Sequence, residues 1–285
     1  MKRKVIGLSA VVVAGLALAG LSRAWWVKGH ESIAEAAAVN LPDEVPAFFR
    51  AGGKQMAHYA GDPDRWKNPS CKQLRDAIGP DHFLDLEDFH GKDLPQTRYE
   101  AIALLYQLKE KPEKVGMLPW AIMENYDRLS CAFYDLRQEP DNAAIRAKCL
   151  VFAGNLCHLT GDCVMPLHTT RHYNGWVAAD GKVTQRGIHA KIDAFPEKNG
   201  LTPEEMARGL KAEAINDVWA YVLKTMNESH KHIERCYELD KAGAFDKPTA
   251  ESRKFILERC RAGAQFTMDL WYSAWLRSAK MPKHY

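Results

Sequence analysis

The 285-residue chain lacks several patterns that would place it in a familiar class. No two cysteines form a C-x-x-C pair, which disfavours a zinc ribbon. The metalloprotease pattern H-E-x-x-H is missing, because His30 and Glu31 have no second histidine at the required spacing. The sequence also shows no internal repeat, no linker and no convincing alternation of apolar and polar residues. We therefore expect neither a repeat protein nor a sheet protein.

The chain also lacks a large excess of positive or negative charge when its N-terminal segment is left out. Three basic residues at positions 2–4 precede the apolar run 6–21, and Ser22 and Ala24 place small residues at a cleavage site. We expect residues 1–24 to be a cleaved signal peptide, since the run is short for the alternative, an uncleaved membrane anchor. Cleavage removes four basic residues and changes the formal net charge from +3 to −1. A strongly basic nucleic-acid-binding protein is therefore not indicated.

The expected mature chain, residues 25–285, has a length that suits one domain, secreted or periplasmic. Its seven cysteines would allow up to three disulfide bonds in an oxidising compartment and leave one thiol over. The sequence does not indicate which cysteines would pair.

Helical periodicity dominates the mature chain and predicts an all-α fold, a compact bundle of roughly seven to nine helices. Residues 60–70 and 169–187 are rich in glycine and other turn formers and are expected to be loops. The predicted helical segments are 33–40, 42–50, 54–59, 71–78, 96–109, 112–137, 142–163, 203–232 and 249–278.

Histidine and aspartate are concentrated between Asn155 and Asp193. His158 and Asp162 stand four residues apart, as do His189 and Asp193, with His168 between the two pairs. Side chains four apart lie on one face of a helix and can converge on one cation. One such pair could simply be a surface hydrogen bond, but two pairs and a third histidine favour a multinuclear site, and the mixed donors suit Zn²⁺.

These residues belong to a longer series of motifs. The chain has W-x4-H (Trp25, His30), D-x-x-R (Asp62, Arg65), H-F-x-D (His82 to Asp85), H-x3-D-x5-H and a later H-x3-D. The series resembles the trinuclear-zinc superfamily, which contains the single-strand-specific nucleases of fungi and plants and the bacterial zinc-dependent phospholipases C. The resemblance covers residues 25–193, while residues 194–285 contribute only helical patterns.

The resemblance implies three zinc ions and assigns their ligands. Asp62, His82, His158 and Asp162 would hold the first ion. The second would be held by His168, His189 and Asp193, and the third by Trp25, through its amine and carbonyl, with His30 and a bridging Asp162. Arg65 would face charge developing on the phosphate, and Asp62 could orient or deprotonate the attacking water. Phe83 and Asp85 fall where the nucleases stack on a base and hydrogen-bond it.

Some positions depart from the family pattern. Asp64 competes with Asp62 for the same ligand position, and the D-x-x-R register with Arg65 favours Asp62. His172 stands close enough to His168 to be an alternative ligand. Ile188 precedes the expected ligand His189, and Ile192 replaces the aromatic residue expected before Asp193. These changes concern substrate specificity more than metal binding.

The expected activity is zinc-dependent hydrolysis of phosphodiesters, because zinc can lower the pKa of bound water to about 7. Arg65 favours an endonuclease acting on single-stranded nucleic acid. The alternative is a phospholipase C with a phospholipid substrate, and a non-catalytic zinc-binding protein is a weaker third possibility. No protein partner is implied, and a monomer is expected.

Overall fold

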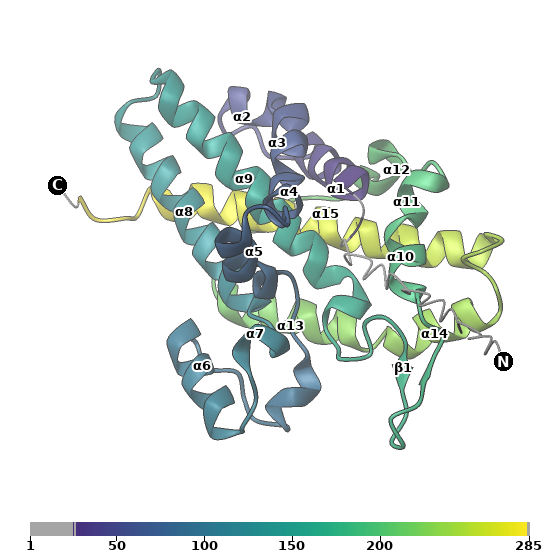
Figure 1. The fold of residues 1–285 in the computed structure, drawn as a ribbon. Coiled ribbons are helices and arrows are strands. Elements are labelled where there is room, and N and C mark those ends of the chain that lie inside the picture. The colour runs from purple at the N-terminus through teal and green to yellow at the C-terminus, as the bar shows by residue number, and fades with distance from the viewer. Residues whose placement is uncertain (1–24, 26, 284–285) are drawn as a thin grey trace, which may run out of the picture.

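Four helices carry about half of the buried apolar residues in the computed structural model, which describes residues 25 and 27–283 (Figure 1). They are α1 (Val27–Val39), α8 (Leu118–Gln138), α9 (Ala143–Val164) and α15 (Ala250–Ser278). Helices α9 and α15 each contact the other three. The all-α fold predicted from the sequence is confirmed.

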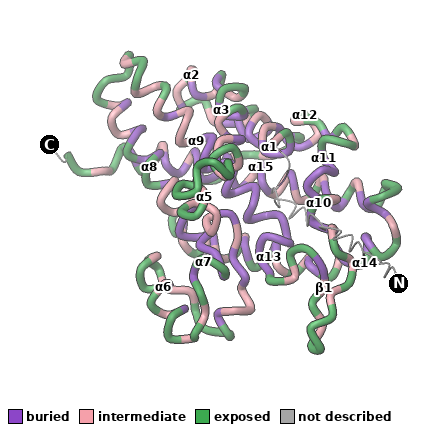
Figure 2. The backbone as a smooth tube through the Cα atoms, in the orientation of Figure 1, coloured by how far each residue is buried: buried purple, intermediate pink, exposed green. Residues whose placement is uncertain are grey.

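Helix α9 lies at the centre of the molecule. The Asn142 side chain caps its first turn by accepting hydrogen bonds from two backbone N–H groups. Every residue from Ala153 to Val164 is buried, as expected of a helix packed on all sides (Figure 2). At Gly161 an added Cβ would lie 2.7 Å from Nδ1 of His30, so α1 approaches α9 where a side chain is missing.

Shorter elements surround these four helices. The 3₁₀ segments are η1 (Gly79–His82), η2 (Leu86–Phe89) and η3 (Pro166–His168). A two-residue antiparallel pair is formed by β1 (Trp176–Val177) and β2 (Val183–Thr184). The remaining helices are α2 (Ala47–Ala51), α3 (Gly53–Ala60), α4 (Asp62–Trp66), α5 (Lys72–Ile78), α6 (Arg98–Gln107), α7 (Pro112–Val115), α10 (Ile188–Asp193), α11 (Phe195–Lys198), α12 (Pro203–Ala207), α13 (Val218–His230) and α14 (Ile233–Lys241).

The described residues thus contain more and shorter helices than the seven to nine expected. One predicted helix, residues 203–232, is divided into α12 and α13, and Gly209 between them has a φ of 73°, which an α-helix does not contain. The expected loop 60–70 contains α4. The expected loop 169–187 contains the β1–β2 hairpin, which is too short to show an alternating sequence pattern.

The disulfide prediction is wrong, because all seven cysteines are free thiols. Five of them are buried separately in the helical core, where a cysteine acts as a small apolar side chain. The other two, Cys71 and Cys131, are exposed. The predicted signal peptide lies outside the described residues, and none of the helices within them is long and apolar enough to cross a membrane.

Candidate metal centre

Seven of the predicted ligands come together as buried side chains. They originate from five elements: α1, η1, α9, η3 and α10. Each is at most 4% exposed, an unusual degree of burial for so many ionisable groups. The seven are His30, His82, His158, Asp162, His168, His189 and Asp193.

The carboxylate of Asp162 lies at the middle of this group. Its Oδ2 atom is 3.0 Å from Nδ1 of His82 and 3.3 Å from Nε2 of His158. Its Oδ1 atom is 3.4 Å from Nε2 of His30 and 3.9 Å from Nδ1 of His168. The two oxygens therefore face different imidazoles, an arrangement compatible with a bridging carboxylate.

His82, His158 and Asp162 form one group of converging donor atoms. Nδ1 of His158 donates a hydrogen bond to the carbonyl oxygen of Ala60 at 2.7 Å, which leaves its Nε2 lone pair free. This Nε2 lies 2.9 Å from Nδ1 of His82. Two ligand nitrogens about 3.3 Å apart are expected around a tetrahedral zinc ion, so the spacing suits coordination.

His168, His189 and Asp193 form a second group. Nδ1 of His168 donates to the carbonyl oxygen of His82 at 2.5 Å, and Nδ1 of His189 donates to that of Tyr173 at 3.1 Å. The two Nε2 atoms consequently face each other with lone pairs at 3.1 Å, and Oδ2 of Asp193 is 3.1 Å from Nε2 of His189. Facing lone pairs repel unless a cation or a proton lies between them.

A third group consists of His30, Asp64 and His158. The ring of His30 stacks on that of His158 with the centroids 3.9 Å apart. Neither ring nitrogen of His30 makes a hydrogen bond, although the side chain is fully buried. A buried imidazole with two unpaired nitrogens is costly unless it binds something.

The structure places Asp64, not the predicted Asp62, in the centre. The Asp64 side chain is 3% exposed, whereas that of Asp62 is 24% exposed and bonded to Arg65. The difference follows from α4, because side chains two positions apart on a helix point about 200° apart. The sequence predicts a loop for this segment, where only the register with Arg65 favours Asp62.

Arg65 itself does not face the centre. Its Nη1 atom donates to the carbonyl oxygen of His58 at 2.7 Å and to Oδ1 of Asp62 at 2.8 Å. The cation near the ligands is instead Lys67, whose Nζ lies 2.6 Å from Oδ1 of Asp64. Lys67 stands three residues after Asp64, so the motif reads D-x-x-K once the ligand is reassigned.

Trp25 is fully buried, and its indole N–H donates to the carbonyl oxygen of Gly161 at 3.0 Å, next to Asp162. This contact brings the first described residue close to the centre. Its predicted role as a ligand through amine and carbonyl stays a prediction.

A cleft of about 610 Å³ opens beside the centre. His82, His168 and His189 line it, together with the cations Lys67, Arg75 and Lys114 and the predicted substrate-binding residues Phe83 and Asp85. Burial, and next Asp88 and Glu87, raise the pKa of Asp85 to about 8. Its carboxyl group can therefore donate as well as accept a hydrogen bond near neutral pH.

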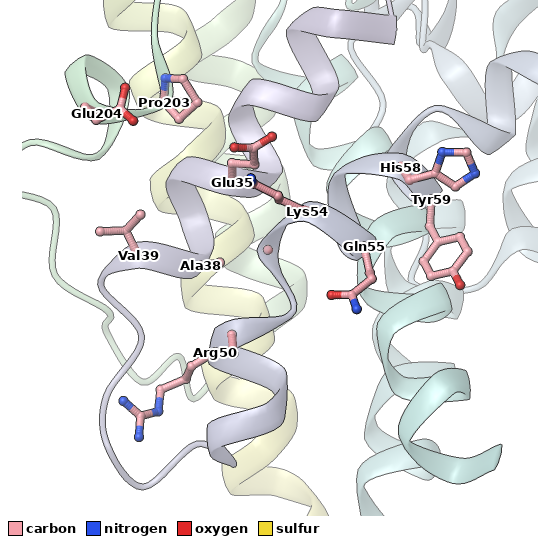
Figure 3. Close-up of a pocket in the computed structure, with 12 residues that line it drawn as sticks. Glu35, Ala38, Val39, Arg50, Lys54, Gln55, His58, Tyr59, Pro203 and Glu204 are labelled. Carbon is pink, nitrogen blue, oxygen red and sulfur yellow. The ribbon is translucent and has the colours of Figure 1, made fainter. Parts of the chain in front are cut away.

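His172, considered as an alternative ligand, belongs to none of the three donor groups. Its ring stacks on Trp176 with the centroids 4.5 Å apart. A further groove, of about 650 Å³, lies where α1, α2, α3 and α12 meet, with Glu35, Arg50 and Lys54 around it (Figure 3). It contains none of the candidate ligands.

The donor set fits zinc. Both oxygens of Asp193, Oδ1 of Asp162 and Nε2 of His82 are buried without a hydrogen bond. Burial, with Lys67 as the next cause, lowers the pKa of His82 to about 4, and burial lowers that of His168 to about 3. Burial alone would raise the pKa of Asp162, but the imidazoles of His158 and His168 hold it well below its usual value. Zinc binds neutral imidazoles and ionised carboxylates. His82 and His168 are thus in the state that binds zinc. Burial would also lower the pKa of His158 and His189, but Asp162 and Asp193 respectively raise it, so zinc competes with protonation at these two imidazoles.

No protein-family model and no curated protein matches the sequence. Among solved structures, the chain is similar to the alpha-toxin of Clostridium perfringens isolated from an avian strain, with a TM-score of 0.48 and 14% identity. The match covers 90% of this chain and 64% of the toxin chain. A likeness of this degree assigns neither a family nor a function.

Proposed function

We propose that this protein is a zinc-dependent hydrolase of phosphodiester bonds. The observation that carries the proposal is the set of three donor groups, with the Asp162 carboxylate between the imidazoles of His30, His82 and His158, beside an open cleft. Both cations and carboxylates line that cleft: Lys67, Arg75, Lys114, Asp76, Asp85 and Glu113. A purely structural zinc site is closed, with four protein ligands. A shared carboxylate beside an accessible cleft instead suits a catalytic centre.

Each part of the centre has a distinct task. Bound zinc would supply hydroxide at neutral pH and would balance charge on the phosphate. His82, His158 and Asp162 would hold one ion, and His168, His189 and Asp193 a second. Asp64, whose donor atom converges with those of His30 and His158, would lie between the first site and that of His30. His30, Asp162 and Trp25 would complete a third site. Oδ2 of Asp64 makes no hydrogen bond and can accept a proton from the attacking water.

We assign charge stabilisation to Lys67 in place of Arg65. The Lys67 side chain lines the cleft, and its charge acts on the imidazoles of His82 and His168. Lys67→Ala should lower kcat/KM about 10²–10³-fold, the range for losing one preorganised donor to a developing anion. Arg65→Ala is the matched control and should change kcat/KM less than about threefold, since surface ion pairs contribute little. A larger loss in Arg65→Ala would contradict the assignment.

Two classes of substrate suit the cleft. The sequence favours nucleic acid because of Arg65. Since Arg65 lies at the surface and does not face the metal centre, it no longer favours one substrate over the other. Phe83 and Asp85 could receive a base, while the same residues could contact a phospholipid head group. Phospholipid is therefore at least as good a candidate as single-stranded nucleic acid.

The test uses protein beginning at Trp25, assayed in parallel on single-stranded DNA or RNA and on phosphatidylcholine micelles. We expect turnover of one substrate that is abolished by a chelator and restored by zinc. Release of nucleotides alone would identify a nuclease, and release of the head group alone a phospholipase C. Zinc-loaded protein that cleaves neither would contradict the proposal.

A further inference from the structure

Helix α10 carries two of the candidate ligands, His189 and Asp193, on only six residues. A helix this short is not stable by itself, so contacts with the rest of the chain determine how it is oriented. Both carboxylate oxygens of Asp193 are buried, and no hydrogen bond to them is formed among the described residues. The direction in which Asp193 points therefore depends on the rotation of α10 about its own axis.

Lys191 stands between these two ligands in the sequence but on the other side of the helix. Successive helical residues are about 100° apart, so Lys191 points about 200° away from His189. Its Nζ atom donates to Oδ1 of Asp240 on α14 at 2.9 Å and to Oδ2 of Asp246 at 2.8 Å. The Asp240 side chain is 6% exposed and that of Asp246 59%. An exposed ion pair restrains little, whereas a buried charge-assisted hydrogen bond fixes both of its groups.

The other oxygen of Asp240 fixes the chain that leads into α10. Oδ2 accepts a hydrogen bond from Nε2 of Gln185 at 2.9 Å, and the same Nε2 donates to the carbonyl oxygen of Tyr237 at 2.9 Å. Gln185 has a φ of 51°, in the left-handed region that residues other than glycine rarely adopt. Such a conformation persists only where surrounding contacts hold it. Asp240 therefore contacts both the helix and the segment that enters it.

The remaining contacts of α10 act in other ways. Ile188 and Ile192 are fully buried and hold the helix against the core, but apolar contacts are not directional. Hydrogen bonds also hold the backbone at the start of the helix and the ring of His189. Neither of them reaches the carboxylate of Asp193. The contact with Asp240 adds a restraint on rotation from the side that faces away from the metal centre.

We propose that Asp240 is a positioning residue for the metal site formed by the second donor group. It holds Lys191 and Gln185 in place. Helix α10 thereby keeps the rotation at which His189 and Asp193 converge on one ion. This inference rests on the proposed zinc centre, but it concerns how tightly one ion is bound and not the identity of the substrate.

The test measures zinc binding by chelator competition, followed by elemental analysis of the zinc that remains. In Asp240→Asn an NH₂ group replaces one carboxylate oxygen, so either Lys191 or Gln185 loses its acceptor whichever way the amide is turned. We expect one zinc equivalent to bind about 10–100-fold more weakly, while the others keep the wild-type affinity. Lys191→Gln breaks the ion pair from its more exposed side and should give a loss of the same order. Lys191→Arg keeps the cation and should stay within about threefold of the wild type.

Two controls separate positioning from general destabilisation. Asp246→Asn removes only the exposed acceptor of Lys191, and the zinc affinity should change less than about threefold. Phe133→Leu shrinks a fully buried side chain of α8. It should lower the melting temperature through the cavity that it creates and leave the zinc affinity unchanged.

Undiminished zinc affinity in Asp240→Asn and Lys191→Gln would overturn the inference and leave the proposed function intact. If Asp240→Asn does not fold, Lys191→Gln decides alone. An equal loss of affinity in Phe133→Leu would also overturn the inference, because it would show that any destabilisation weakens zinc binding. Zinc-loaded wild type without phosphodiester turnover would instead overturn the function and leave the inference intact.

Discussion

Asp62 and Asp64 lie two residues apart on α4 but in different surroundings: one forms a surface ion pair, and the other is a buried candidate ligand. Asp64 is 3% exposed within the centre, and Asp62 binds Arg65 outside it. Both are aspartates on one helix of five residues. Their roles therefore depend on which face each side chain occupies.

This pair gives a matched test of the ligand assignment. Asp64→Asn should lose bound zinc and lower kcat/KM at least about 100-fold, because one anionic group of the centre is removed. Asp62→Asn should retain zinc and most activity, since it loses only a surface ion pair of about 0–1 kcal/mol. Elemental analysis and steady-state kinetics distinguish the two. The opposite result would restore the sequence-based choice of Asp62.

The carboxyl group of Asp85 should give the ion-free protein a defined pH dependence. Burial raises its folded pKa from 3.8 to about 8, so its contribution to stability is present below about pH 4 and lost as the pH rises through 8. Asp85→Asn cannot ionise, so its free energy of unfolding should match the wild type near pH 4. Near pH 8.5 it should exceed the wild type by at least about 1 kcal/mol.

Urea unfolding in the presence of a chelator measures this difference. The exposed Asp93 provides the control, and Asp93→Asn should leave the pH profile unchanged. A gap between Asp85→Asn and the wild type that is constant with pH would contradict the prediction.

At the scale of elements, α14 fixes the loop that orients His189. The hydroxyl of Tyr237 on α14 donates to the carbonyl oxygen of His172 and accepts from the N–H of Gly175 at 3.0 Å. Between these two residues, the carbonyl oxygen of Tyr173 accepts the Nδ1 proton of His189. The tyrosine hydroxyl thus supports a zinc ligand through the backbone.

Tyr237→Phe should therefore weaken zinc binding. We expect about a tenfold loss of affinity at the His168–His189–Asp193 group, typical of a removed supporting interaction. The free energy of unfolding should fall by about 1 kcal/mol for the lost hydrogen bonds. Tyr99→Phe is the control, because Tyr99 is 84% exposed. Equal zinc affinities in the two variants would show that the loop holds His189 without this hydroxyl.

Helical periodicity predicts the fold class, and H-x3-D spacing predicts two ligand pairs, because both depend on contacts three or four residues apart. His30 and His82 are expected as ligands only from the family resemblance. The H-x3-D pair of His158 and Asp162 could be placed on one helix face directly. Asp64 could not be assigned to the buried face of a helix from the sequence. A helix of five residues, such as α4, is too short to show a periodic pattern. The unpaired Nε2 atom of His82 results from long-range packing, which no local pattern records.

The stability of the whole molecule depends on the metal centre, because folding buries the charged carboxylates that it contains. Asp162 and Asp193 are at most 1% exposed, and both lack full hydrogen bonding. Zinc binding to the folded state should thus contribute strongly to stability, by about 4 kcal/mol when free zinc is 1,000 times the dissociation constant.

We expect a chelator to lower the melting temperature by about 10 °C, since 1 kcal/mol corresponds to roughly 2–4 °C in a chain of this size. Differential scanning calorimetry checks this, with restoration by zinc and not by magnesium, which disfavours imidazole ligands. An unchanged melting temperature would indicate that the buried charges are compensated without metal.

Helix α15 contacts the ligand-bearing helix on both sides of His158. The indole N–H of Trp271 donates to the carbonyl oxygen of Ala153 at 3.1 Å, and the hydroxyl of Thr267 lies 2.6 Å from that of Thr160. Every predicted ligand nevertheless precedes residue 194. A premature stop codon ahead of Ala250 would therefore leave the complete metal-binding motif in the translated product while removing the helix against which α9 is packed.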